Sequence, residues 1–254
     1  MIIHFRRALA GLFPPRRKRC VLCGKRLSWF LPYRNGVASV PALIRELDLI
    51  GSDVSNFTCP WCFSHDRERH LFLYMQATGF LPDLDGRDVL HFAPEARLSR
   101  VIASAGTSRY VRCDLHPVEA DVVHVDILAI PFADESFDLV IANHVLEHVA
   151  DDRKALLEIR RVLRKDGSAI LQTPYCNRLH HTWEDPGIDD DRARLQACGQ
   201  EDHVRLYGRD IFQRFAACGL APRIRQHADL LGDIDVVSLG VNPREPFMMF
   251  QRPD

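Results

Sequence analysis

The stretch from Val122 to Pro174 constrains the fold more than any other part of this chain. An apolar run ends at Asp126, a turn follows, and a second strand-like run spans Phe137–Ala142. An amphipathic helix, an Asp-Gly pair and a third strand-like run then lead to Thr173. Two crossover units in succession predict parallel strands, because parallel neighbours are joined by long connections that are usually helical. Open parallel sheets bind ligands beyond the carboxyl ends of their strands, where Asp126 and His144 fall.

The same alternation extends along most of the chain. Strands are expected at 88–92, 110–114, 122–126, 137–142 and 168–173, helices at 94–105, 152–165 and 207–218, and a terminal strand pair at 236–239 and 247–251. We therefore expect an α/β fold with a Rossmann-like, doubly wound, mostly parallel sheet over residues 86–254. The long polar segment 176–207 is typical of a lid over a substrate.

Two Cys-x-x-Cys pairs mark the N-terminal region, Cys20/Cys23 and Cys59/Cys62, with 35 residues between them. Each pair holds two thiolates on one tight turn, and two such turns complete a tetrahedral Zn²⁺ site. We therefore expect residues 20–65 to form a small module with structural zinc, which would supply much of its folding free energy. Unpaired thiols or a redox pair are the alternatives.

Two segments flank this module. Residues 1–19 form a basic leader in which residues 2–19 fit an amphipathic helix on a membrane surface, a frayed tail, or a helix packed on its own domain. Residues 66–85 are expected to form a linking helix, on which Arg67, Arg69 and His70 either face a ligand or belong to a solvated surface.

The composition limits the kinds of partner that this chain is expected to bind. The formal net charge of -1 gives no general attraction to nucleic acid or to anionic membranes. No apolar run approaches the roughly 20 residues of a membrane-spanning helix. Four further cysteines, which stand apart in strand and helix contexts, indicate buried thiols and a reducing cytoplasm: Cys113, Cys176, Cys198 and Cys218.

Acids follow the second and third predicted strands of the sheet. Asp114 lies 20 residues past Pro94, close to the interval expected for a carboxylate that accepts hydrogen bonds from both ribose hydroxyls of a nucleotide cofactor. Asp126 lies where it can accept from the amino group of a base. Either acid alone could cap a helix. Because the two acids occur at the ends of successive strands, however, they favour a nucleotide-binding site.

At this point the chain resembles the class I S-adenosylmethionine-dependent methyltransferases, most closely the type 11 group, over about residues 87–175. The matching pieces are residues 89–93, Asp114, the block from Asp126 to Asp138, the segment 144–148 and the segment 158–167. The resemblance implies S-adenosylmethionine as cofactor, with Asp114 on the ribose. It also implies that Asp126 and Ile127 flank the adenine and that Asn143 and His144 lie near the methyl group.

The first loop departs from the family pattern, which is rich in glycine. Here it reads His91-Phe92-Ala93-Pro94-Glu95 and contains no glycine. Glycine lets a backbone approach a cofactor closely, and Ala93 is the smallest substitute present. Glu95 is expected to bind the methionine ammonium, with His91 as a weaker candidate. The cysteine pairs and this loop together resemble a bacterial subgroup of the type 11 proteins.

Methyl transfer from a sulfonium depends mainly on alignment, and a hydroxyl or amine acceptor also gains from a general base. The candidates are His144, His180, His181 and His203, with Tyr207 among the polar residues after the lid. Of these, we predict that His144, His203 and Tyr207 are the catalytic residues. His144-x-x-Glu147-His148 also fits an inverted zinc-peptidase motif, which requires an α-helix that the preceding strand disfavours.

The preferred function is therefore methyl transfer to a small-molecule or glycan acceptor. A catalytically silent binding module is one alternative, and the loop without glycine supports it. An RNA or protein methyltransferase that docks through the zinc module and the basic run Arg16–Arg19 is another.

Overall fold

The computed structural model describes residues 17–254, so residues 1–16 of the expected leader lie outside it. Its centre is a seven-stranded sheet in the order β12-β13-β8-β7-β4-β5-β6. The strands are β4 (Asp88–Phe92), β5 (Arg109–Asp114), β6 (Val123–His124), β7 (Phe137–Ala142), β8 (Leu163–Ile170), β12 (Ala221–Pro222) and β13 (Met249–Gln251). The first five are mutually parallel, and β13 runs antiparallel to both β8 and β12. This order confirms the doubly wound, mostly parallel fold.

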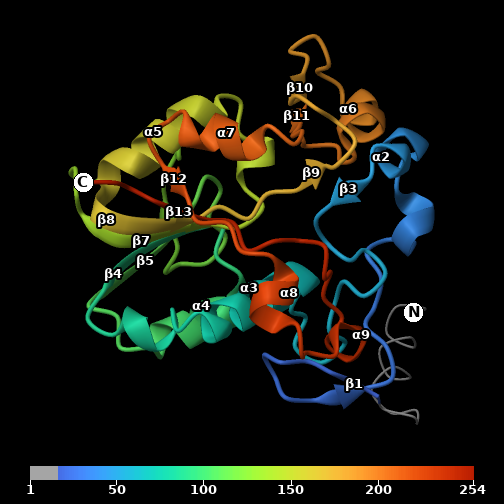
Figure 1. Cartoon of the computed structure of the whole chain (residues 1–254), viewed down its shortest axis with the longest axis horizontal. Coiled ribbons are helices and arrows are strands. Elements are labelled where there is room, and N and C mark those ends of the chain that lie inside the picture. The colour runs from blue at the N-terminus through green and yellow to red at the C-terminus, as the bar shows by residue number, and fades with distance from the viewer. Residues whose placement is uncertain (1–16) are drawn as a thin grey trace.

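Helices cover both faces of the sheet (Figure 1). On one face lie α5 (Asp152–Val162) and α7 (Ile211–Ala216), and on the other lie α3 (Asp66–Ala77), α4 (Ala96–Ala103) and α8 (His227–Leu231). The strand sequence explains this sandwich, because successive side chains point to opposite faces. In β7, Val140 belongs to the hydrophobic core beneath α5 and α7, whereas Leu139 and Ile141 belong to the core beneath α3 and α4.

The N-terminal module begins with a hairpin of β1 (Lys18–Arg19) and β2 (Arg26–Leu27). An excursion follows through the 3-10 turn η1 (Gly36–Ser39), α2 (Ala42–Glu46) and β3 (Leu49–Ile50). The remaining short elements are the 3-10 turns η2 (Pro82–Leu84) and η3 (Leu146–His148), the strands β9 (Tyr175–Cys176), β10 (Trp183–Glu184) and β11 (Arg205–Leu206), and the helices α6 (Asp191–Cys198) and α9 (Val236–Leu239).

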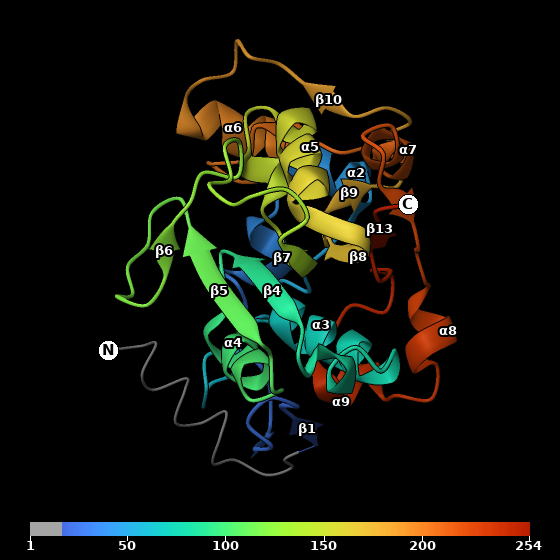
Figure 2. The ribbon, with the colours of Figure 1, turned by 90° about the vertical axis from the view of Figure 1, so that its left-hand side faces the viewer.

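The excursion packs against the expected lid. Strand β3 pairs with β9, and Ile44 of α2 shares a small hydrophobic core with Cys176, Cys198 and Leu206. Figure 1 shows α2 and β3 beside α6 and β9, and Figure 2 shows α6 and β10 beyond one end of the sheet. Segments far apart in sequence therefore meet beyond the carboxyl ends of the parallel strands.

Several expected elements differ from the structure. Residues 236–239 form the helix α9 and not a strand, because the Asp235 side chain caps its start and Gly240 ends it at φ +61°. Strand β13 instead pairs with β12 and β8. The helix expected at 152–165 ends at Val162, so the Asp-Gly pair lies inside β8.

The helix expected at 207–218 covers only 211–216. None of the helices within residues 17–254 is long and apolar enough to cross a bilayer.

Candidate active site

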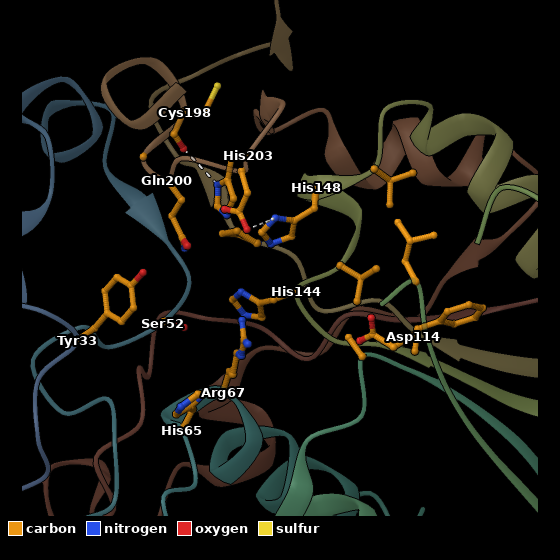
Figure 3. Close-up of a pocket in the computed structure, with 18 of the residues that line it drawn as sticks. Tyr33, Ser52, His65, Arg67, Asp114, His144, His148, Cys198, Gln200 and His203 are labelled. Carbon is orange, nitrogen blue, oxygen red and sulfur yellow. Dashed lines mark hydrogen bonds and ion pairs between the residues drawn. The ribbon is translucent and has the colours of Figure 1, made fainter. Parts of the chain in front are cut away.

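A cavity of about 880 Å³ lies at the carboxyl edge of the parallel strands (Figure 3). It adjoins the switch point between β4 and β7, where the strand order reverses and where such sheets bind their ligands. Its lining comes from the strand ends, the N-terminal excursion, the start of α3 with the residues before it, and the lid. Its polar lining includes Tyr33, Arg34, Ser39, Ser52, His65, Arg67, Asp114, His116, Asp126, His144, His148, Gln200, Asp202 and His203.

The sheet wall contains four of the residues expected to hold the cofactor: Ala93 after β4, Asp114 at the end of β5, and Asp126 with Ile127 after β6. One carboxylate oxygen of Asp114 accepts from the His116 backbone N–H at 2.7 Å. One oxygen of Asp126 accepts from the Leu128 N–H at 2.8 Å. Each acid thus stabilises its own turn, and its second oxygen has no hydrogen-bond partner among residues 17–254.

The loop after β4 keeps a glycine-like backbone without glycine. Ala93 adopts φ +46°, in the left-handed region that a Cβ atom disfavours. Its N–H donates to the Cys113 carbonyl at 2.8 Å, which ties the loop to β5. Strained backbone of this kind clusters at functional sites, where the surrounding structure enforces it.

His91, Glu95 and Asn143 lie behind this wall and do not line the cavity. One Glu95 oxygen lies 3.1 Å from His91 Nε2, and the other accepts from the Asn143 side-chain amide. Burial alone would raise the pKa of Glu95, but its contact with His91 outweighs burial and lowers it. Glu95 is therefore an ionised group that joins β4 to the end of β7.

His144 follows β7 at φ +56° and is buried between two carboxylates. Its Nδ1 lies 3.4 Å from Glu147 Oε1, and its Nε2 lies 3.3 Å from Glu245 Oε1. Burial favours neutral imidazole, but Glu147 and Glu245 outweigh it and raise the pKa of His144 to about 9. At neutral pH its ring therefore donates hydrogen bonds and is not poised to accept a proton.

The other two expected catalytic residues, His203 and Tyr207, lie in different parts of the structure. His203 lines the cavity beside His148, and the two rings meet edge to face with centroids 4.7 Å apart. Tyr207 lies in the hydrophobic core instead, where its hydroxyl donates to Asp152 at 2.7 Å. The structure therefore brings His144 and His203 to the cavity but keeps Tyr207 away from it. His180 and His181 are exposed and do not line it either.

The peptidase motif does not have its required setting. His144 precedes η3, and residues 146–148 form a single 3-10 turn and not an α-helix. His144 uses both ring nitrogens on Glu147 and Glu245, so it does not share a metal position with His148.

Most residues of the N-terminal wall were not identified individually from the sequence. Tyr33 and Ser52, which lie just before and just after the excursion, line the cavity, as do Phe57, His65 and Arg67. Arg67 was expected to face either a ligand or solvent. It lines the cavity, and its Nε is buried without a hydrogen-bond partner among residues 17–254. In the sequence, only the positive charge of Arg67 near the second cysteine pair indicated a site residue. No sequence feature indicated that the excursion would line the cavity.

Two other basic side chains of α3 are structural. The Arg69 guanidinium donates only to backbone carbonyls. His70 lies between Glu245, at 3.1 Å, and His227, at 2.8 Å.

The four N-terminal cysteines meet as expected for a metal centre. Their sulfur atoms lie within 4.8 Å of one another, with Cys20 to Cys62 at 3.7 Å and Cys23 to Cys59 at 3.9 Å. Tetrahedral zinc with bonds of about 2.3 Å holds its sulfurs roughly 3.8 Å apart, so this spacing fits Zn²⁺. The two turns also match in backbone, because the residue after each second cysteine has a left-handed φ, +70° at Gly24 and +64° at Phe63.

Comparisons with known proteins agree with this geometry. Residues 87–171 match the family model described as a methyltransferase domain. The chain is 35% identical over 77 residues to the uncharacterized methyltransferase YcgJ of Bacillus subtilis, covering 30% of this chain and 28% of that protein. It is 31% identical over 112 residues to a malonyl-(acyl-carrier protein) O-methyltransferase of Halorhodospira halophila, covering 43% and 34%. The chain thus spans about a third of these curated relatives.

Among solved structures, the Burkholderia thailandensis 1,6-didemethyltoxoflavin-N1-methyltransferase aligns with a TM-score of 0.47 and 16% identity, over 72% of this chain and 79% of that one. The cysteine module lies outside the residues that the family model matches. The strand order agrees with the match to a methyltransferase domain over residues 87–171, and over this span the chain is similar to the class I methyltransferases.

Proposed function

We propose that this protein is an S-adenosylmethionine-dependent methyltransferase whose cofactor lies along the ends of β4, β5 and β6. One observation carries the proposal: Ala93, Asp114 and Asp126 lie at or just after the ends of three adjacent strands, in order, and line a single cavity. Asp114 would accept from the ribose hydroxyls, and Asp126 with Ile127 would hold the adenine.

Arg67 supports a further assignment for the methionine end. Its guanidinium would pair with the cofactor's carboxylate, because its Nε is buried in the cavity wall without a partner. Glu95, which was expected to bind the ammonium, would act indirectly by fixing His91 and Asn143 behind the loop.

When bound, the cofactor supplies an electrophilic methyl group, so the protein's main contribution is alignment and exclusion of water. His144 and His203 line the cavity beyond the cofactor's place and would contact the acceptor. The lid and the excursion, which are joined through β3 and β9, would close over both ligands.

A small-molecule or glycan acceptor fits best. The cavity volume lies within the range of about 300–1,000 Å³ that is usual for small-molecule sites. A cavity lined by several separate segments of the chain favours a small acceptor, or the tip of a glycan, over a nucleic-acid surface. We also propose that Cys20, Cys23, Cys59 and Cys62 hold structural zinc and that the protein works in the cytoplasm, where its eight unbridged cysteines would stay reduced.

The decisive experiment is calorimetric titration with S-adenosylhomocysteine, the demethylated cofactor. Asp114→Asn keeps the shape but removes the charge, and a hydrogen bond to a charged group contributes about 1.5–3 kcal/mol. We expect affinity about 10- to 150-fold weaker. Asp233→Asn, at an exposed site away from the cavity, is the matched control. Equal affinity in the two variants would refute the assignment of Asp114.

A catalytically silent binding module is the second candidate. The specific observation in its favour is that both Glu95 oxygens are already bonded within the protein, in a loop that contains no glycine. The same titration separates the two functions, because a wild-type protein that binds neither S-adenosylmethionine nor S-adenosylhomocysteine would support the silent module.

A further inference from the structure

A second group of potential metal ligands lies on the cavity wall, far along the chain from the cysteines. Glu147 and His148 come from η3, and His203 comes from the segment before β11. Each offers a ligand atom within 4.8 Å of the others. Figure 3 shows His148 and His203 side by side at one end of the cavity.

The two segments that supply these ligands are fixed to each other. The Val204 N–H donates to the Glu147 carbonyl at 3.0 Å. The buried Arg205 guanidinium donates to the carbonyls of Leu146, Val149 and Ala150, which surround η3. The ligand positions are therefore held by the backbone before any ion binds, as a precise site requires.

Two of these three side chains carry a buried polar atom without a partner. Glu147 Oε2 and His203 Nε2 have no hydrogen-bond partner among residues 17–254, and both side chains are more than nine-tenths buried. A buried polar atom without a partner costs about 1–3 kcal/mol, so such an atom in a native protein calls for a ligand. Here two of them belong to one cluster of three.

The second nitrogen of each histidine is oriented as in known metal sites. His203 Nδ1 lies 3.2 Å from the Cys198 carbonyl, which only accepts, so Nδ1 carries the proton and Nε2 offers its lone pair. His148 Nδ1 lies 3.1 Å from the Asp202 carboxylate, which leaves His148 Nε2 on the side of Glu147. Metal-bound histidines almost always make this kind of outer hydrogen bond to a carbonyl or a carboxylate.

We infer that Glu147, His148 and His203 bind one divalent transition-metal ion on the cavity wall. Two imidazoles and one carboxylate suit ions such as Zn²⁺, Fe²⁺ or Co²⁺ and leave coordination positions open. Bonds of about 2.1 Å place ligand atoms roughly 3.0–3.4 Å apart, so the three side chains need only a small inward rotation.

The open positions face the cavity, because His148 and His203 both line it. The role in catalysis rests on the proposed methyltransferase function: the ion would bind the acceptor's hydroxyl and promote loss of its proton to water. The resulting oxygen anion forms a bond to the methyl carbon as the carbon–sulfur bond breaks, and that electron pair stays on sulfur in S-adenosylhomocysteine.

The test is a Co²⁺ titration of tag-free, zinc-loaded protein, followed by calorimetry and optical absorption. We expect one Co²⁺ per chain beyond the cysteine-bound zinc, without the thiolate charge-transfer band that exchange into the cysteine cluster would produce. His148→Gln, at the least buried ligand, should weaken Co²⁺ binding at least 10-fold. Glu147→Gln, which keeps the side-chain shape, should do the same, whereas His181→Gln, at an exposed histidine, should not.

No additional Co²⁺ in the wild type would mean that only water fills the cluster, and equal affinity in His148→Gln would mean an adventitious ion elsewhere. Either result overturns the site. S-adenosylhomocysteine binding, measured on the same samples, separates this inference from the proposed function: cofactor binding without Co²⁺ refutes only the metal site. Co²⁺ binding without cofactor binding refutes only the methyltransferase.

Discussion

Replacing Arg69 with lysine should destabilise the packing of the N-terminal module against α3 and α9. Arg69 is fully buried, and its guanidinium lies over the Phe30 ring at 3.9 Å. It donates five hydrogen bonds, to the carbonyls of Asn56, Phe57, Ser64, Leu239 and Gly240, at 2.6–3.2 Å. One side chain therefore joins the second cysteine turn, α3 and α9.

The magnitude follows from the number of donors. A lysine ammonium has three N–H donors, so at least two of the five carbonyls lose their partner. Hydrogen bonds to charged groups contribute about 1.5–3 kcal/mol each, which gives a loss of about 3–6 kcal/mol. That is a large part of the 5–15 kcal/mol typical of a folded domain. Because lysine keeps the positive charge, Arg69→Lys tests the number and geometry of the hydrogen bonds and not the effect of the charge.

The assay is urea denaturation followed by circular dichroism and by tryptophan fluorescence, since Trp29 and Trp61 both lie in the N-terminal module. Arg100→Lys, at an exposed position on α4, is the control and should change the free energy of unfolding by less than about 0.5 kcal/mol. If Arg69→Lys lost less than about 1 kcal/mol, the carbonyl network would not be the stabilising feature described above.

Two further predictions concern the proposed zinc centre and the loop after β4. Removing zinc with a chelator, or replacing Cys59 with serine, should unfold residues 20–65 and shift the fluorescence emission of Trp29 and Trp61. Added Zn²⁺ should restore the emission of the wild type but not that of the serine variant. Unchanged emission would contradict a structural role for zinc. Ala93→Gly should be neutral or stabilise by up to about 1 kcal/mol, because relief of the left-handed strain offsets the freer unfolded chain. Ala93→Val should cost about 2 kcal/mol or more in thermal denaturation, and equal stability of the two variants would contradict the strain.

The parallel core was predictable because its signals are local. The strands Asp88–Phe92 and Phe137–Ala142 have the predicted bounds, since short apolar runs between turn residues need no distant partner to be recognised. The strand-end acids were predictable for the same reason. Where local signals conflict, propensity alone failed, as at 236–239, where capping by Asp235 and Gly240 outweighed the strand preference of two valines.

The N-terminal wall of the cavity was not predictable in this way. Its position depends on the pairing of Leu49 with Cys176, which are more than 120 residues apart. Such pairing depends on which apolar faces remain unburied after the sheet forms, and a periodic pattern does not contain that information. Likewise, the charge of Arg67 and Arg69 was visible, but only the packing of α3 separates a cavity residue from a structural one.

By itself, then, the sequence determined the strands of the parallel core, the acids at their ends and the two cysteine pairs, because each depends on residues close together in the chain. Only the tertiary structure decided that Tyr207 belongs to the core, that Glu95 is bonded within the protein, and that Glu147, His148 and His203 converge. Those outcomes depend on which side chains remain unpaired once distant segments pack, and burial makes each such pairing energetically decisive.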